Sequence, residues 1–337
     1  MKKPAVSVLL PVRNGADFLA GALDSIATQS FRDWECIVVD DGSTDDSVDI
    51  AARFAAHDPR FKVAARQHVG LVAALNAGLD LCSAPLVARM DADDISLPHR
   101  LEKQATLLHE QPEITLCGCL VEAFPPEHVG EGMALYIDWL NSVADEADIA
   151  RDFFVESPFA HPSVMFRRDA VVAVGGYQDH GWPEDYDLWM RLFVSGARFT
   201  KVPETLYLWR DYPERMSRTH RSYTIPKFRK LKAHYLLQSR LRSRSRITLW
   251  GAGREGRWWL REFATAGVEV ARLIDVDPKK IGRRIGEIPI LPPDTLASRE
   301  SGDFIVCAVG ARGARLLIRD TLLEFGYTEI TDFIFVA

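Results

Sequence analysis

Three aspartates stand together directly after an apolar run in the first third of the chain. Leu86 to Met90 reads as a buried strand, and Asp91, Asp93 and Asp94 follow it at once. In an α/β protein, carboxylates at such a strand end lie at the carboxyl edge of the sheet, where ligands bind. Clustered carboxylates repel one another, and hard oxygen ligands favour Mg²⁺ or Mn²⁺, which usually also bind substrate phosphates. The residues therefore suit a divalent-cation site, although an acidic turn that caps the next helix would use the same residue types.

A second acidic pair, Asp40 and Asp41, follows the apolar run Cys36 to Val39. A carboxylate here can accept hydrogen bonds from a nucleotide base or from ribose hydroxyls. A simple helix cap is the alternative, because Ser43 and Thr44 also favour such a position. Because both acidic groups follow strands of one series, we expect them at the same sheet edge. That arrangement would place a nucleotide site beside a metal site, as a bound nucleoside diphosphate requires.

A third acidic group, Glu184, Asp185 and Asp187, follows the turn Gly181 to Pro183. The helix predicted from Tyr186 to Leu192 holds Asp185 at its start, where the positive end of the helix dipole favours an ionised carboxylate. An ionised carboxylate can act as a general base towards a hydroxyl group. The alternative is that the three acids only complement the helix dipole.

The elements that must position these acids alternate between strand and helix. Such alternation predicts a parallel sheet with right-handed crossovers, and hence the α/β fold class. The expected strands are 6–12, 36–39, 62–65 and 86–90, and the expected helices are 16–29, 47–56 and one that begins at 71. Further on, Cys117 and Cys119 lie in an apolar run that we interpret as buried strand rather than as a redox pair.

Length and composition limit the class of protein. With 337 residues the chain exceeds one comfortable core, which favours two domains. Apolar residues make up 47% and charged residues 26%, as in ordinary globular proteins. A net charge of −6 argues against general nucleic-acid binding. The cysteines show neither disulfide nor zinc spacing, and the apolar stretch near the amino terminus is too short for a signal peptide or a membrane span. We therefore expect a cytoplasmic protein.

The acidic groups belong to longer motifs. These are SVLLPVRNGADF, CIVVDDGSTDDS, GLVAALNAGLDLCSAPLVARMDADDISLP, HPSVMFRRDAVVAVGGY and PEDYDLWMRL, in that order. Together they resemble the motifs of the family-2 glycosyltransferases of the GT-A fold, over roughly Ala5 to Tyr212. The resemblance implies a GT-A nucleotide-sugar-binding domain with a mostly parallel central sheet. It also implies inverting transfer from a nucleotide-diphosphate sugar and a divalent metal, Mn²⁺ or Mg²⁺.

The resemblance further implies roles for individual residues. Asp185 matches the catalytic base, and Asp91 and Asp93 match the metal motif. The residues implied for nucleotide-sugar binding are Pro11, Arg13, Asp41 and Asp91, with Asp41 against the base. This division suits in-line displacement at an anomeric carbon, where a metal offsets charge on the leaving diphosphate and a base deprotonates the acceptor. His68 departs from the family, which often has an asparagine near this position.

Three residues near the base motif are candidates for the acceptor side: Glu184, His161 and Trp182. Packing explains His161 equally well, and tryptophan is more often buried than exposed as a stacking surface for a sugar ring. The acidic segment Val121 to Ala150 reads as irregular, and it stands where an acceptor-specific insertion would be expected.

Basic residues dominate residues 215–246, and no acid occurs from Arg215 to Arg254. We expect a partly helical linker in this region. Its cations favour peripheral contact with an anionic membrane surface. A solvated interdomain helix that packs its narrow apolar stripe on the first domain explains the segment as well.

Residues 247–337 form a predicted second, smaller α/β domain. Gly251, Gly253 and Gly256 follow a strand and open a helix, and Asp275 ends the next strand, as in a dinucleotide site. The segment resembles the Rossmann-like module of bacterial polysaccharide biosynthesis enzymes. It is half the size of a full dinucleotide domain, so a nucleotide site and a packing-only module are both open.

The sequence thus predicts a GT-A domain in residues 1–214, a linker in 215–246 and a Rossmann-like domain in 247–337. The predicted activity is that of an inverting glycosyltransferase of bacterial surface polysaccharide or glycoconjugate synthesis, with a glycan or lipid-linked acceptor. A sugar-phosphate nucleotidyltransferase is one alternative, but its glycine-rich phosphate loop is missing near the amino terminus. The other is a non-catalytic nucleotide-sensing or scaffold protein, against which the intact acidic motifs argue.

Overall fold

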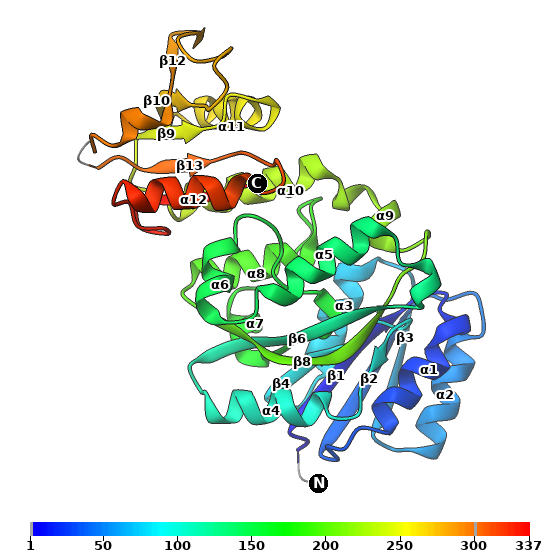
Figure 1. The fold of residues 1–337 in the computed structure, drawn as a ribbon. Coiled ribbons are helices and arrows are strands. Elements are labelled where there is room, and N and C mark those ends of the chain that lie inside the picture. The colour runs from blue at the N-terminus through cyan, green and yellow to red at the C-terminus, as the bar shows by residue number, and fades with distance from the viewer. Residues whose placement is uncertain (1–2, 300–301) are drawn as a thin grey trace. The chain divides into compact units, whose positions relative to one another are not determined.

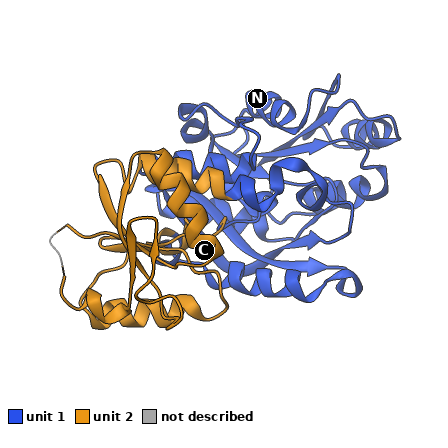
Figure 2. Cartoon of the chain, turned by 90° about the horizontal axis from the view of Figure 1, so that it is seen from above, with its two compact units in different colours: residues 1–149, 158–228 blue, residues 150–157, 229–337 orange. Residues whose placement is uncertain are grey.

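The computed structural model describes residues 3–299 and 302–337. The chain separates into two compact units (Figure 2). Unit 1 comprises Met1–Ile149 and Pro158–Phe228, and unit 2 comprises Ala150–Ser157 and Arg229–Ala337. The expected linker, residues 215–246, is therefore divided between the two units, and a short segment from the middle of the chain belongs to unit 2.

In the described part of the chain, unit 1 is built on an eight-stranded sheet (Figure 1). The strand order is β3-β2-β1-β4-β7-β6-β8-β5. Pairing is parallel from β3 to β4, whereas β7 and β5 run antiparallel to their neighbours. The predicted α/β class with a mostly parallel sheet is confirmed. The strands are β1 Val6–Val12, β2 Trp34–Asp41, β3 Phe61–Arg66, β4 Leu86–Arg89, β5 Ile95–Ser96, β6 Ile114–Phe124, β7 Met165–Arg167 and β8 Arg198–Arg210.

Helices cover this sheet, and the loops that join strands to helices lie at its edge. They are α1 Ala16–Ala27, α2 Ser47–His57, α3 Leu71–Leu81, α4 Arg100–Glu110, α5 Glu131–Ser142, α6 Glu146–Asp152, α7 Arg168–Ala173, α8 Glu184–Val194 and α9 Met216–Thr219. Short 3₁₀ turns are η1 Pro126–His128, η2 His161–Ser163 and η3 Arg221–Tyr223, and α10 Ile225–Gln238 contains the boundary between the units. Within residues 3–299 and 302–337, no helix combines the length and the apolar character needed to cross a bilayer.

The central strands are buried along their whole length. Every residue of β1 and β2 is buried, which is typical of strands covered by helices on both faces. Val8 and Leu10 pack into one core with α1, α2 and α4, whereas Leu9 faces α3. Gly78 permits the close approach of α3, because a Cβ there would lie 2.2 Å from Leu9 Cδ1 and 2.8 Å from Val39 Cγ2. This packing fixes the strand ends that carry the acidic residues.

The prediction of an irregular segment from Val121 to Ala150 is wrong. β6 continues to Phe124, and η1, α5 and most of α6 occupy the residues that follow. The acidic composition concealed an apolar helical spacing, because Ile137 and Leu140 lie three residues apart and are buried on one side of α5.

Among its described residues, unit 2 contains a six-stranded sheet in the order β11-β12-β10-β9-β13-β14. The predicted succession of strand, helix and strand around Gly251 is present as β9, α11 and β10. All pairs are parallel except β11 with β12. The elements are β9 Arg246–Trp250, α11 Arg254–Thr265, β10 Glu269–Ile274, β11 Arg284–Ile285, β12 Ile288–Leu291, η4 Pro293–Leu296, β13 Ile305–Cys307, α12 Ala314–Glu324 and β14 Phe333–Phe335.

A buried lysine ties the segment from the middle of the chain into unit 2. Lys232 of α10 donates to the carbonyl oxygens of Val155, at 2.9 Å, and Val336, at 2.8 Å. Burial lowers the pKa of Lys232, while the charge of Glu156 opposes that shift. This cation of the basic region is therefore used inside the protein.

Candidate active site

The predicted metal motif forms a compact acidic cluster directly after β4. Asp91, Asp93 and Asp94 each place a carboxylate oxygen within 4.8 Å of the others. Asp91 and Asp93 are partly exposed, whereas Asp94 is buried. The buried guanidinium of Arg89 forms an ion pair with Asp91. Two partly exposed carboxylates thus remain open to the surroundings at the end of a buried strand.

Tyrosines from β8 and the segment after it hold the cluster in place. The hydroxyl of Tyr207 donates to Asp94 at 2.9 Å, and the hydroxyl of Tyr212 donates to Asp93 at 2.8 Å. The backbone N–H of Arg210 also donates to Asp94, at 2.7 Å. Asp94 is therefore committed to internal hydrogen bonds, whereas Asp91 and Asp93 are the more exposed carboxylates of the cluster.

The electrostatics of the cluster fit a divalent cation. Burial, reinforced by the charge of Asp91, raises the pKa of Asp93. Burial and the charge of Asp93 raise the pKa of Asp94 well above its usual range. Carboxylates held this close destabilise one another when ionised, and a bound cation would relieve that repulsion. Oxygen ligands of this kind suit Mn²⁺ or Mg²⁺.

The predicted nucleotide residues lie at the ends of the neighbouring strands β1 and β2. Asp41 accepts hydrogen bonds from the backbone N–H groups of Val69, at 2.9 Å, and Gly70, at 3.0 Å. The ring of His68 lies 2.7 Å from the same carboxylate. His68, at which the sequence departs from the family pattern, is thus a direct neighbour of Asp41.

Asp40 and Asp41 have different local roles. Asp40 accepts from the N–H groups of Gly42 and Ser43, both at 3.1 Å, and so shapes the turn after β2. Asn14 joins this turn to the end of β1, because its N–H donates to Ser43 at 2.9 Å. The strand register sets Pro11 opposite Val39. Pro11 is buried and Arg13 is exposed at the same strand end.

The predicted base lies in the first turn of α8. Asp185 accepts a hydrogen bond from the N–H of Tyr186 at 2.7 Å and is partly exposed. Its neighbour Glu184 is buried, and both of its oxygens contact the hydroxyl of Tyr223, at 2.9 and 2.7 Å. His161 lies close by, with its Nδ1 3.7 Å from Glu184 Oε1. The structure thus brings together three of the predicted residues, Glu184, Asp185 and His161.

Asp187 and Trp182 stabilise the start of α8 through buried hydrogen bonds. The fully buried carboxylate of Asp187 accepts from Trp182 Nε1 at 2.8 Å and from Arg191 Nε at 2.8 Å. These bonds fix the turn before α8. Asp185 is therefore the partly exposed acid of this turn that can meet a substrate.

The surroundings of Asp185 favour its protonated form in the free protein. Burial, and then the charge of Glu184, raise the pKa of Asp185 to about 8. Burial also raises the pKa of Glu184, and the hydrogen bond from Tyr223 opposes this shift. Burial and the nearby charge of Arg89 lower the pKa of His161 well below its usual range, so this ring is neutral. Arg89 links the two acidic groups, since it pairs with Asp91 and its charge also acts on Asp185.

In unit 2 the predicted glycine turn and Asp275 do lie together. Asp275 accepts from the N–H of Ala252 and from Lys280 Nζ, each at 2.9 Å. A Cβ at Gly256 would lie 1.7 Å from the carbonyl oxygen of Gly251, so Gly256 serves close packing of α11 against the turn. Gly253 faces open space, because a Cβ there would meet nothing within 4 Å.

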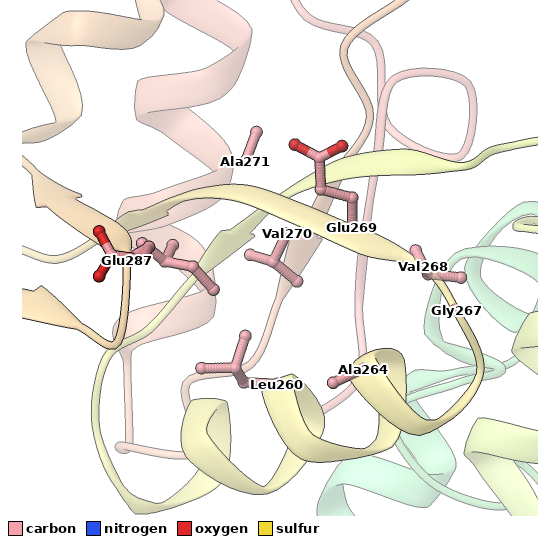
Figure 3. Close-up of a pocket in the computed structure, with 9 residues that line it drawn as sticks. Leu260, Ala264, Gly267, Val268, Glu269, Val270, Ala271 and Glu287 are labelled. Atoms are coloured by element: carbon pink, nitrogen blue, oxygen red, sulfur yellow. The ribbon is translucent and has the colours of Figure 1, made fainter.

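A cavity of about 510 Å³ lies elsewhere in unit 2, between α11 and the β10–β12 edge (Figure 3). Its walls are mainly apolar side chains, with Glu269 and Glu287 at the side, and none of the predicted site residues lines it. The cavity is therefore separate from both the acidic site and the glycine turn.

Sequence reasoning missed several residues that support the acidic site, namely Arg89, Tyr207, Tyr212 and Tyr223. The signal for Arg89 was available, because an arginine inside an apolar run predicts a buried cation that needs an acidic partner. The tyrosines stand in a region with no motif, and the resemblance ended near Tyr212.

Known proteins share this architecture. S. aureus TarS 1-349, solved in complex with UDP-GlcNAc, matches with a TM-score of 0.54 and 18% identity, over 69% of this chain and 67% of that chain. The mannosyltransferase PcManGT from Pyrobaculum calidifontis, solved in complex with GDP-Man and Mn²⁺, matches with a TM-score of 0.50 and 17% identity, over 96% of this chain and 81% of that chain. The predicted GT-A fold is therefore confirmed.

The sequence relationship is closer and defines the family. The family model for glycosyl transferase family 2 matches residues 7–175. The amylovoran biosynthesis glycosyltransferase AmsE of Erwinia amylovora is 36% identical over 203 residues, which cover 59% of this chain and 74% of that protein. The chain belongs to glycosyltransferase family 2, as its motifs predicted.

Proposed function

We propose that this glycosyltransferase is metal-dependent and inverting, and that it transfers a sugar from a nucleotide-diphosphate sugar to a hydroxyl acceptor. The observation that carries the proposal is the pairing of two acidic groups in unit 1. One offers the partly exposed carboxylates of Asp91 and Asp93. The other offers Asp185, whose raised pKa is matched to proton abstraction near neutral pH.

The donor side uses residues at the ends of β1, β2 and β4. Asp41, Arg13 and Pro11 would contact the nucleotide, and Asp91 and Asp93 would hold a divalent cation. When bound, the cation offsets the negative charge that develops on the leaving diphosphate. TarS and PcManGT, which share the fold, were solved with UDP-GlcNAc and with GDP-Man and Mn²⁺, and this supports a nucleotide-sugar donor.

The acceptor side uses the first turn of α8. As the acceptor oxygen forms its bond to the anomeric carbon, the bond from that carbon to the diphosphate oxygen breaks. The hydroxyl proton passes to the carboxylate of Asp185. Attack from the face opposite the leaving group inverts the anomeric configuration. We propose that Glu184, His161 and Trp182 shape the acceptor side.

We place the enzyme in bacterial surface polysaccharide or glycoconjugate synthesis, in the cytoplasm, with a glycan or lipid-linked acceptor. The similarity to the amylovoran biosynthesis glycosyltransferase AmsE supports this role. Contact with an anionic membrane through residues 215–246 is a further element of the proposal. Fewer cations are available for it than composition suggests, because Arg229 and Lys230 pair with Glu255 and Glu262. Exposed cations of the segment include Arg221, Lys227 and Arg242.

The test is a screen of nucleotide-sugars with Mn²⁺ that measures release of the nucleoside diphosphate. A hit is then given candidate acceptors, and the anomeric configuration of the product is read by NMR. We expect chelator-sensitive release and a product inverted relative to the donor. A retained configuration would contradict the proposed mechanism, and full activity in excess chelator would contradict the metal requirement.

A further inference from the structure

We propose that Tyr223 is a positioning residue of the transfer reaction, which acts on the base Asp185 through the carboxylate of Glu184. The inference rests on the proposed function of Asp185 as the base. It assigns a role in the reaction to the segment after β8, which lies beyond the family motifs.

The geometry of the contact is the first argument. The Tyr223 hydroxyl lies 2.9 Å from Oε1 and 2.7 Å from Oε2 of Glu184, so it sits between the two carboxylate oxygens. Glu184 is only 5% exposed, and a buried carboxylate depends strongly on its donors. Within the described residues, Tyr223 makes the side-chain hydrogen bonds to Glu184. Loss of this hydroxyl would therefore leave the carboxylate without its main support.

The position of Glu184 in the sequence and the fold is the second argument. It precedes Asp185 directly in the first turn of α8, so any change in its charge acts on Asp185 at short range. The other titratable or charged groups that face this pair come from separate elements. They are Arg89 from β4, Asp91 after β4, His161 from η2, Tyr177 before α8 and Tyr223 from η3.

These groups affect the ionisation of Glu184 and Asp185 in different directions. Arg89 favours the ionised forms of both acids, and Asp91 opposes ionisation of Glu184. His161 is neutral, and its Nε2 pairs with the Tyr177 hydroxyl at 3.0 Å. The Tyr223 hydrogen bond is thus the largest of the contacts that lower the pKa of Glu184 against its burial; the backbone N–H of Glu184 and the charge of Arg89 act in the same direction.

The consequence for Asp185 follows from like-charge repulsion. An ionised Glu184 raises the pKa of Asp185 and makes it a stronger base towards the acceptor hydroxyl. If Tyr223 no longer donates, Glu184 takes up a proton more readily, and its repulsion on Asp185 is lost. The pKa of Asp185 then falls, which weakens the base but ionises it over a wider pH range.

The experiment measures transfer by the full chain with Mn²⁺ and saturating donor, from pH 5 to 10, for the wild type and Tyr223→Phe. The substitution removes only the hydroxyl group. We expect the acid limb of the kcat profile to move to lower pH by up to about one unit, since a hydrogen bond to a charged group changes the pKa of Glu184 by about that much and only part of this change reaches Asp185. The plateau rate at high pH falls a few-fold, and the donor KM is unchanged.

Glu184→Gln is the second variant, because it removes the charge without relying on Tyr223. It should move the acid limb in the same direction, and the double variant should move it no further than Glu184→Gln alone. Tyr327→Phe is the matched control, since it removes a buried tyrosine hydroxyl that donates to Leu296 O at 3.1 Å in unit 2. Its pH profile should equal that of the wild type.

The outcomes separate this inference from the function on which it rests. If Asp185→Asn abolishes transfer but Tyr223→Phe keeps the wild-type acid limb, the inference is overturned and the function stands. An acid limb that moves to higher pH overturns it too, as does a uniform loss of rate without any shift. Normal transfer by Asp185→Asn would refute the base assignment itself.

Discussion

Two strand ends in this molecule carry carboxylates in similar topological positions but in opposite states. In unit 1, Asp91 and Asp93 follow β4 and stay partly exposed, and burial and like charge raise the pKa of Asp93. In unit 2, Asp275 follows β10. Burial alone would raise its pKa, but hydrogen bonds from Asp277 N–H, Lys280 and Ala252 N–H lower it.

The difference shows what makes a strand-end carboxylate a ligand site. Asp275 is supplied with donors by its own chain, so its ionised form is already stable and needs no partner from outside. Asp91 pairs with Arg89, and Asp93 accepts from the hydroxyl of Tyr212, which leaves their mutual repulsion only partly relieved. Position at the carboxyl edge is therefore common to both units, whereas unsatisfied charge distinguishes the proposed active site.

The largest expected effect is at the base. Asp185→Asn keeps the size of the side chain but cannot take the acceptor proton. Transfer should fall roughly 10² to 10⁴-fold, the usual range for a general base. Donor affinity, measured by calorimetry with Mn²⁺, should barely change. Weak donor binding with normal transfer at saturation would instead place Asp185 in the donor pocket.

The next effect is at the metal cluster. Asp93→Ala removes a proposed cation ligand, so we expect transfer to fall on the order of 10² to 10³-fold, with loss of Mn²⁺-dependent donor binding. Asp275→Ala is the matched change in unit 2, and its transfer rate should be that of the wild type. Comparable losses of transfer in both variants would break the distinction between the two carboxylates.

Thermal stability should change in opposite directions at the two sites. Asp93→Asn removes repulsion, so the metal-free protein should unfold at a higher temperature. Asp275→Ala leaves the N–H of Ala252 and the ammonium of Lys280 without their acceptor. It should lower the free energy of unfolding by about 1 to 3 kcal/mol. Thermal unfolding without metal measures both, and a destabilised Asp93→Asn variant would show that the cluster is not under strain.

The pH dependence of stability tests the environment of Asp185. In the unfolded chain Asp185 loses its proton near its ordinary pKa, whereas the folded protein keeps it until about pH 8. Its contribution is thus fully present at acid pH and is lost as pH rises through about 8. Asp185→Asn should remove this loss and be more stable than the wild type at pH 9. Chemical unfolding at pH 5 and pH 9 gives the comparison.

The acidic motifs could be predicted from the sequence because each is local. A buried strand followed by aspartates, or a turn followed by a helix with an acidic first turn, is visible within about a dozen residues. The supporting hydroxyls could not be predicted, because they come from far along the chain. Tyr207 stands 113 residues from Asp94, and Tyr212 stands 119 residues from Asp93. Their contacts depend on the path of β8 along the sheet, which no single-sequence pattern specifies.

The error in the segment Val121 to Ala150 has a different cause. Its acidic composition favours irregular structure, whereas the structure forms the end of β6 and the helices that follow. The buried positions of α5 are few, so its helical spacing was weak against a background of charge. At the glycine turn, by contrast, the motif predicted the local structure correctly. It could not reveal that Lys280 already donates a hydrogen bond to Asp275.

The smallest expected effect is at Gly253, and it decides whether unit 2 has a ligand. A Cβ at Gly253 meets nothing within 4 Å, so Gly253→Val should fold and transfer like the wild type. Gly256→Ala should destabilise unit 2, because its Cβ would lie 1.7 Å from the carbonyl oxygen of Gly251. The ligand test uses the full chain with Asp93→Ala, in which the donor site is disabled, and titrates NAD by calorimetry. Since Asp275 already accepts hydrogen bonds from Lys280 and from the N–H of Ala252, we expect no heat of NAD binding. Heat that Gly253→Val then abolishes would show a nucleotide site at the turn, and unit 2 would join unit 1 as a region with a carboxylate available to a ligand.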